Sequence, residues 1–177
     1  YLDLEAGTHN VVLVGAEDLG GVVLAETLET EAGANYTVAA TGTFDVNDNS
    51  GVQPVVLTDN ATTPPDEFAA VRLAHLSPDA PEVTVTLDGT DAVVFDAVGF
   101  TESTQYLTIP EGEYSLDIRA GGADGESVQT VDVTLEGGDA QTLHVLGLVD
   151  PNATEDGEPL AVIRTDDNTG HADPTPD

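Results

Sequence analysis

His75, Ser77 and Asp79 bring the residue types of a hydrolase triad into one short segment. A catalytic triad needs a hydrogen bond between the nucleophile and its base. On an extended chain, alternate side chains point to the same face but lie about 6.6 Å apart, which is too far for that bond. We therefore expect Ser77-Pro78-Asp79 to form a turn whose Ser and Asp side chains bond nearby backbone N–H groups.

Acidic loops form the second group of candidate sites. An EF-hand that began at Asp45 would need Gly at its sixth position and Glu at its twelfth, where the sequence has Ser50 and Val56. That motif is therefore excluded. Two interpretations remain, a looser calcium site or solvated acidic loops, and no other cofactor is expected. The candidate calcium ligands are Asp45, Asn47, Asp150 and Asn152.

Three Asn-x-Thr tripeptides mark candidate sites of N-glycosylation. Their acceptors are Asn35, Asn60 and Asn152, and each lies in an expected loop or at the edge of an expected strand. Asn60 is the best candidate, because it lies in an expected linker between two repeats.

The charge of the chain restricts its partners. Its 177 residues include three Arg, no Lys and 34 acidic residues, which gives a net charge of −31. A surface this negative repels phosphate backbones and anionic lipids, which excludes nucleic-acid and membrane-surface binding. The Debye length falls from about 10 Å at 0.1 M salt to about 3 Å at 1 M, so concentrated salt weakens the repulsion among these charges. The composition therefore indicates molar-salt surroundings, the habit of halophilic archaea.

Other features of the composition exclude further classes of protein. The chain has no Cys, which excludes disulfides, thiolate metal sites and Cys nucleophiles. It has no run of about 20 apolar residues that could span a membrane, and no visible signal peptide. Because the chain starts with Tyr1 rather than Met, we expect a mature or trimmed product.

Short strands dominate the sequence pattern. The segments Val83–Leu87 and Val131–Leu135 alternate between apolar and polar residues and end at Asp-Gly or Gly-Gly. Similar runs, about 8 to 14 residues apart, predict an all-β, immunoglobulin-like antiparallel β-sandwich. Asp66–Leu76 fits a helix or a strand. The three arginines lie on expected strands, where we predict cross-strand ion pairs: Arg72, Arg119 and Arg164.

An internal repeat organises the chain. Sliding the sequence by 105 positions aligns Tyr1-Leu2 with Tyr106-Leu107, and no gap is needed before Pro54 meets Pro159. The four histidines do not recur between the copies, so no shared metal site is predicted. Other aligned pairs are Gly7 with Gly112, Gly33 with Gly138, Thr37 with Thr142, and Gly42 with Gly147.

The two copies are not equally long. We predict the second half of a first sandwich repeat at 1–57, a linker at 58–68, a complete second repeat at 69–165 and an acidic flexible tail at 166–177. The earlier copy has no counterpart of Val71–Gln105, so its apolar face needs covering strands. Residues upstream of Tyr1 or strands from a neighbouring subunit could supply them.

The opening of the complete copy carries a resemblance. It reads VRLAHLSPDAP over 71–81, followed by Val83-Thr84-Val85 and Asp88-Gly89. This segment resembles the domain-of-unknown-function family 4397, whose hallmark is a strand that ends in His-x-Ser-Pro-Asp-Ala-Pro. Tyr106-Leu107 and the turn at 135–138 also match. The resemblance implies a secreted, envelope-associated, immunoglobulin-like sandwich, often in tandem and common in halophilic archaea, without an established enzymatic activity.

Together these observations predict a non-catalytic extracellular or cell-surface protein of a halophilic archaeon. We expect a structural or adhesive role, in which subunits of a filament or envelope assembly complete one another's strands. The partners would be further copies or other envelope proteins, with no nucleic acid and no direct membrane insertion. The alternative is a carbohydrate- or calcium-dependent ligand-binding module.

The charge also predicts that stability rises with salt. We expect cooperative folding in molar NaCl or KCl and loss of tertiary structure below about 0.5 M, because weaker screening leaves carboxylate repulsion unopposed. Thermal unfolding followed by circular dichroism between 0.1 and 3 M salt checks this. An unchanged melting temperature over that range would contradict it.

Overall fold

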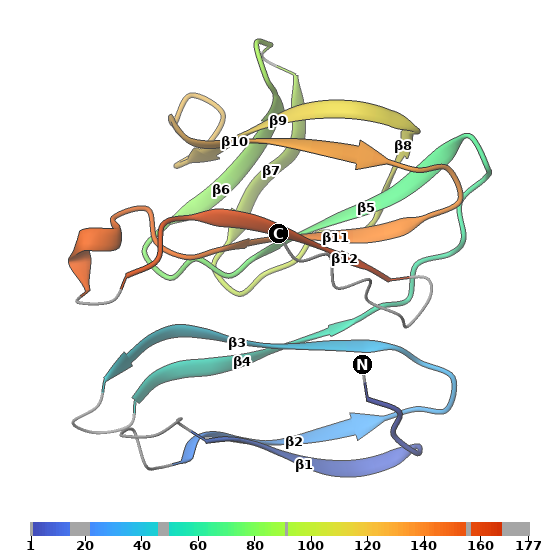
Figure 1. The fold of residues 1–177 in the computed structure, drawn as a ribbon, viewed down its shortest axis with the longest axis vertical. Helices are drawn as coiled ribbons and strands as arrows, with labels where there is room; N and C mark the ends of the chain where they lie inside the picture. The colour runs from blue at the N-terminus through green and yellow to red at the C-terminus, as the bar shows by residue number, and fades with distance from the viewer. Residues whose placement is uncertain (1, 15–21, 46–49, 91, 155–156, 168–177) are drawn as a thin grey trace. The chain divides into compact units, whose positions relative to one another are not determined.

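The computed structural model describes residues 2–14, 22–45, 50–90, 92–154 and 157–167 (Figure 1). The chain divides into two compact units, Tyr1–Asn60 and Ala61–Asp177. Apart from one short 3-10 helix, the regular elements of the described residues are all strands. The predicted all-β sandwich class is therefore confirmed.

The first unit consists of two antiparallel hairpins (Figure 1). Strand β1 pairs with β2 and strand β3 pairs with β4, and each pair forms a separate two-stranded sheet. The strands are β1 (Gly7–Val14), β2 (Val22–Thr30), β3 (Tyr36–Asp45) and β4 (Ser50–Thr58).

The second unit contains two four-stranded sheets, in the orders β10-β9-β6-β7 and β12-β11-β5-β8. All pairings are antiparallel except that of β5 with β11, which is parallel. The elements are β5 (Phe68–His75), β6 (Glu82–Leu87), β7 (Val93–Gly99), β8 (Leu107–Pro110), β9 (Gly112–Ala120), β10 (Glu126–Leu135), β11 (Ala140–Leu146), η2 (Pro151–Ala153) and β12 (Ala161–Asp166).

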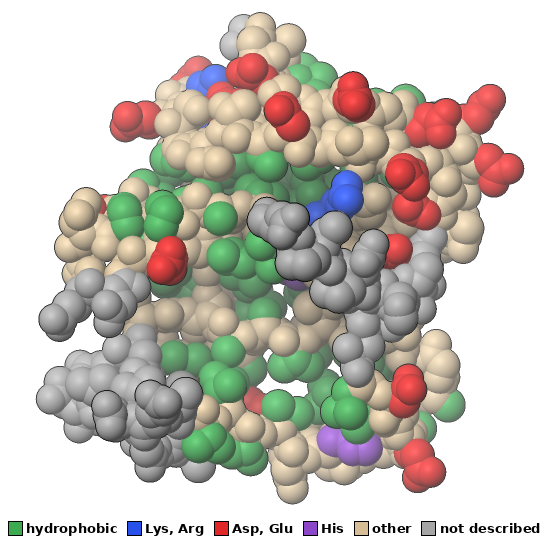
Figure 2. Space-filling view, in the orientation of Figure 1, with side chains coloured by type: hydrophobic (Ala, Val, Ile, Leu, Met, Phe, Trp, Pro, Cys, Tyr) green, Lys and Arg blue, Asp and Glu red, His purple; other side chains and the backbone are tan. Residues whose placement is uncertain are grey.

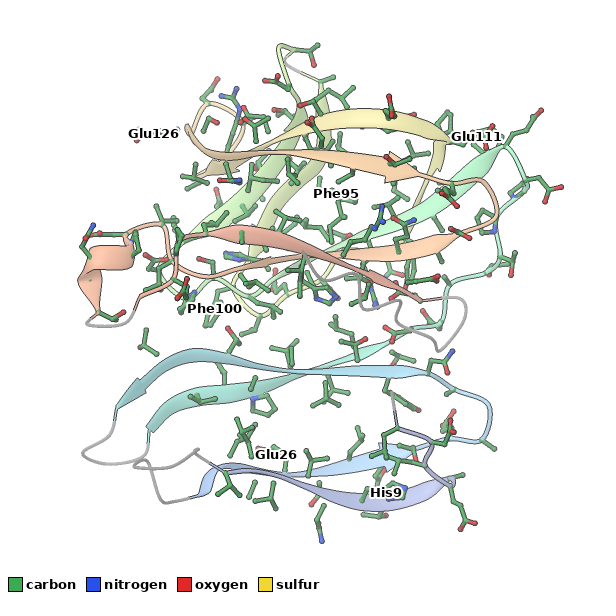
Figure 3. All side chains as sticks on the ribbon, in the orientation of Figure 1. His9, Glu26, Phe95, Phe100, Glu111 and Glu126 are labelled. Atoms are coloured by element: carbon green, nitrogen blue, oxygen red, sulfur yellow. The ribbon has the colours of Figure 1, made fainter. Side chains whose placement is uncertain are left out.

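The core of the second unit lies between its two sheets. One cluster of buried apolar side chains joins β5 and β11 to β6 and β9, and Phe95 of β7 lies among them (Figure 3). Every residue of β5 from Ala69 to His75 is buried. A strand covered on both faces loses the alternation that marks a half-buried strand, which is why the segment also fitted a helix.

The β1–β2 hairpin repeats the geometry of β9–β10. Gly7 pairs with Thr30 as Gly112 pairs with Leu135, and both glycines have positive φ angles, 148° and 151°. The register of each hairpin shifts once, at positions exactly 105 residues apart in both strands. The two copies therefore share even their β-bulge.

The β3–β4 and β11–β12 hairpins also correspond, but with a shift that corrects the sequence alignment. Ala40 pairs with Pro54, and the equivalent Val145 pairs with Val162. Pro54 therefore corresponds to Val162, and the predicted match to Pro159 is wrong. Between these equivalent paired positions the second unit has three more residues than the first, because Val162 lies 17 positions after Val145 whereas Pro54 lies 14 after Ala40, and η2 falls in this longer stretch.

Acidic side chains project from much of the visible surface, with few cations among them (Figure 2). The cross-strand ion pair predicted for Arg119 is wrong, because its partner Asp117 lies on the same strand, with 2.7 Å between Nη2 and Oδ2. Arg164 donates from Nη1 to the Thr134 carbonyl at 2.8 Å. No helix within the described ranges is long and apolar enough to cross a membrane.

Gly147 should be hard to replace. Its φ is +82°, and an added Cβ would run into the Pro159 carbonyl group. Gly121 has a φ of +83° with open space around it, which makes it a matched control. We expect Gly121→Ala to lower the free energy of unfolding by about 1 kcal/mol and Gly147→Ala by about 3 kcal/mol. Thermal unfolding in 3 M salt measures both, and equal losses would contradict the steric argument.

Candidate functional site

The three residues of the triad pattern do not form a proton relay. The His75 ring accepts the Ser77 backbone N–H at Nδ1, 3.3 Å away, while the Ser77 hydroxyl donates to Asp79 Oδ1 at 3.1 Å. The imidazole is buried, contacts Phe100 edge-on and has no hydrogen-bond partner at Nε2 among the described residues. Burial lowers the pKa of His75. A hydrogen bond with the Ala80 backbone and the negative charge of Asp79 partly offset this effect.

The Asp79 carboxylate links the turn between β5 and β6 to the segment that follows β11. Its carboxylate accepts the backbone N–H groups of Val149 at 2.9 Å and Asp150 at 2.8 Å. Burial pushes its pKa up, but these two bonds and the Ser77 hydroxyl outweigh that effect, so the pKa is lowered. The predicted turn is confirmed at Pro78-Asp79. The predicted bonding to nearby backbone N–H groups is wrong for the main contacts, because the Ser77 hydroxyl donates to Asp79 and the N–H groups of Val149 and Asp150 lie 70 and 71 residues away in the sequence.

A second polar cluster surrounds Arg72 on β5. Arg72 alternates with the core residues Val71 and Leu73, so it lies on the face of the sheet opposite the core. Its Nε donates to Thr142 Oγ1 at 2.9 Å, and its guanidinium lies 4.6 Å from the centre of the Tyr106 ring.

Asp167 completes this cluster. It accepts hydrogen bonds from Thr142 at 2.5 Å and from Tyr106 at 2.8 Å, and it lies 3.7 Å from Arg72. Burial, followed by the hydrogen bond and charge of Asp167, raises the pKa of Tyr106. Arg72 thus neutralises a carboxylate that two hydroxyl groups also hold in place.

The first unit repeats part of this cluster. Thr37 donates to Asp59 at 2.9 Å, as Thr142 donates to Asp167, and the Asp59 N–H bonds the Asn35 carbonyl at 2.9 Å. The corresponding bond in the second unit joins the Asp167 N–H to Ala140 at 2.8 Å. The sequence alignment matched the two threonines but missed the two aspartates, because the three-residue insertion displaces them.

Two strand edges of the first unit are open where the equivalent edges of the second unit are paired. In the second unit, β9 pairs with β6 as well as β10, and β11 pairs with β5 as well as β12. Within the part of the chain that the structure describes, their counterparts β1 and β3 pair only with their hairpin partners. Residues 2–5, the counterpart of β8, form no strand among the described residues, because β8 itself pairs with β5.

Apolar side chains show the effect of the absent strands. Ile118 and Leu143 are fully buried, whereas Leu13 and Val38, at the corresponding positions of β1 and β3, are each 42% exposed. Glu26 pairs with Val11 and shares its face, where the second unit has Val131 (Figure 3). The first unit is therefore half of a sandwich with an accessible inner face.

Comparison with known proteins gives one result. The family described as a domain of unknown function (DUF4397) matches residues 1–86 and 69–175. The chain belongs to the DUF4397 family. No curated protein matches the chain. The two DUF4397 matches share residues 69–86, which contain most of β5, most of β6 and the turn between them.

The other predicted sites of this DUF4397 protein are only partly described. Asp45 ends β3, and Asn47 lies outside the described residues. Asp150 precedes η2 and accepts the Asn152 backbone N–H at 3.1 Å. Among the residues that the structure describes, no three His, Asp or Glu side chains gather as a metal site would require. The three glycosylation candidates are exposed: Asn35, Asn60 and Asn152.

The Asp79 bonds should stabilise the second unit. We expect Asp79→Asn to lower its free energy of unfolding by about 1 kcal/mol at pH 7, a value reduced for solvent screening because Asp79 is exposed. A lowered pKa gives stability above the unfolded value, which is lost as the pH falls through the folded value, so the difference should shrink below about pH 4.

Denaturant unfolding of the wild-type chain and the Asp79→Asn variant between pH 3 and 7 measures the difference in their free energies of unfolding. Asp124→Asn is the matched control, because it removes one exposed carboxylate from the turn between β9 and β10. A deficit of Asp79→Asn that is equal at every pH would contradict the role given to the charge.

Proposed function

We propose that this DUF4397 protein is a non-catalytic structural or adhesive component of an extracellular or cell-surface assembly of a halophilic archaeon. The observation that carries the proposal is the half-sandwich of the first unit, whose complete counterpart lies in the same chain. The first unit would be completed by strands from a neighbouring subunit.

Open strand edges support this mode of assembly. An unpaired edge presents a row of backbone N–H and C=O groups that another strand can pair with. Both β1 and β3 offer such an edge, next to the partly exposed apolar side chains Leu13 and Val38. Addition of a strand would then bury apolar surface and give the unpaired backbone N–H and C=O groups hydrogen-bond partners at the same time.

Surface composition supports the halophilic and the extracellular parts of the proposal. The net charge of −31 suits a protein that works in concentrated salt. Exposed acceptors at Asn35, Asn60 and Asn152 suit glycosylation, which the intact mass of native material would report.

The inner face of the first unit should control self-association of the chain. In 3 M NaCl we expect oligomers at high protein concentration, in which the open strand edges of different copies pair, and amides of β1 and β3 protected from hydrogen exchange only in those oligomers. Light scattering and hydrogen exchange measured by mass spectrometry follow both effects. Soluble monomers with β1 and β3 protected at every concentration would rule out completion between subunits.

Two variants of adjacent residues make the test specific. Leu13 lies on the inner face and Val12 on the outer face of β1, and both are exposed. We expect Leu13→Glu to raise the concentration needed for association about tenfold or more, because it places a charge in the contact. Val12→Glu adds the same charge to the other face and should have little effect.

A further inference from the structure

The second unit shows which strands the first unit lacks. Strand β5 lies beside β11 and β6 beside β9, while β7 extends the sheet beyond β6. These three strands precede β8 in the chain and have no counterpart in the described part of residues 1–60. The missing group is therefore one continuous segment, and the repeat gives its register.

On β3, the register places one position of a donor strand opposite Thr37. In the second unit β5 runs parallel to β11, with Arg72 opposite Thr142. Because Thr37 corresponds to Thr142, a strand added to β3 in the same register carries its counterpart of Arg72 opposite Thr37. A slip by one residue would turn that side chain to the other face.

The first unit already holds the polar groups that an arginine at this position would meet. The Thr37 hydroxyl donates to the Asp59 carboxylate at 2.9 Å, as Thr142 donates to Asp167. The backbone N–H of each aspartate is also bonded in the same way in both units. A guanidinium opposite Thr37 would donate to the hydroxyl and pair with the carboxylate, as Arg72 does.

On β1, the register describes the second contact. Val85 of β6 pairs with Ile118, and Leu87 pairs with Leu116. The corresponding positions on β1 are Leu13 and Val11. A β6-like strand would therefore lie beside β1 and extend the inner face of the half-sandwich with its own apolar side chains, as β6 extends the core face of β9 in the second unit.

We propose that the first unit is an acceptor for a three-stranded segment with the pattern of β5–β7, supplied from outside residues 1–177 and carrying an arginine opposite Thr37. This inference rests on the proposed function and names its donor. The arginine recognises Thr37 and Asp59 and fixes the register, while the second strand of the segment closes the β1 edge.

Counting strands restricts the donor further. The printed sequence contains one segment of this pattern, Phe68–Gln105, and the second unit uses it. An identical copy could donate that segment only by opening its own second unit, which leaves the number of incomplete acceptors unchanged. The donor is therefore a segment of this pattern that lies outside residues 1–177 and is not already paired in a sandwich of its own.

The test adds a synthetic segment to the intact chain. The probe is the peptide of residues 66–105, mixed with the 1–177 chain in 3 M NaCl. We expect hydrogen-exchange protection to appear in β1 and β3 and the chain's self-association to decrease as the peptide fills the acceptor. Absence of new protection at saturating peptide would overturn the proposal.

Arginine dependence makes the test specific. We expect the Arg72→Gln peptide to bind about tenfold more weakly, because it removes the charge that meets Asp59. Asp59→Asn in the chain should weaken the wild-type peptide similarly, and the two changes together should weaken it little more than either alone. The Asp88→Asn peptide is a control that keeps the arginine. Equal binding of all peptides would overturn the assigned register.

A tethered form covers the case in which the free peptide is insoluble. Residues 66–105, joined ahead of residue 2 by a flexible Gly/Ser linker, restore the strand order of the second unit. We expect this chain to show protected β1 and β3 amides as a monomer, and unprotected amides would overturn the proposal.

The outcomes separate this inference from the proposed function. Peptide binding by a chain that never self-associates would support the acceptor and count against self-assembly through the inner face. Self-association without peptide binding would support self-assembly and overturn the acceptor.

Discussion

Completion of both sheets by one continuous segment is the constraint on which this fold depends. In the second unit, β5 provides the partner of β11 and β8, and β6 provides the partner of β9 and β7. Without β5–β7, the remaining strands are two hairpins and an unpaired β8. That is the condition of the first unit, where residues 2–5 form no strand and the inner face is accessible.

The backbone geometry of the hairpins depends on local contacts, whereas the burial of their side chains depends on distant strands. The shared bulge, the positive φ of Gly7 and Gly112, and the Thr–Asp hydrogen bond persist whether or not the sandwich is complete. Each depends on contacts within a hairpin or at its end. Burial instead depends on strands distant in sequence, which is why Leu13 is exposed and Ile118 is not. Hairpins of this kind are preformed parts of a domain whose stability comes from long-range packing.

Sequence patterns could predict the elements of this fold better than their partners. Alternation and turn residues identified the all-β class and the Ser77–Asp79 turn, because both are local. The parallel pairing of β5 and β11 leaves no mark on periodicity, and a strand buried on both faces does not alternate. In the ungapped alignment Pro54 matched Pro159 by chance, so the three-residue insertion in the second unit was not recognised. The equivalence of Asp59 and Asp167 was missed for the same reason. Likewise, no spacing rule joins Asp79 to backbone groups 70 residues away.

Glu26 gives the incomplete unit a means of rejecting unsuitable contacts. A contact that buries the face shared by Glu26 and Val11 must remove water from a carboxylate, which costs several kcal/mol unless a partner charge is present. Two such faces in contact would also bring two carboxylates into a poorly hydrated space. Chance encounters are therefore short-lived, even though the neighbouring side chains are apolar. In the proposed assembly, reversibility of this kind would let mismatched contacts separate before further subunits are added.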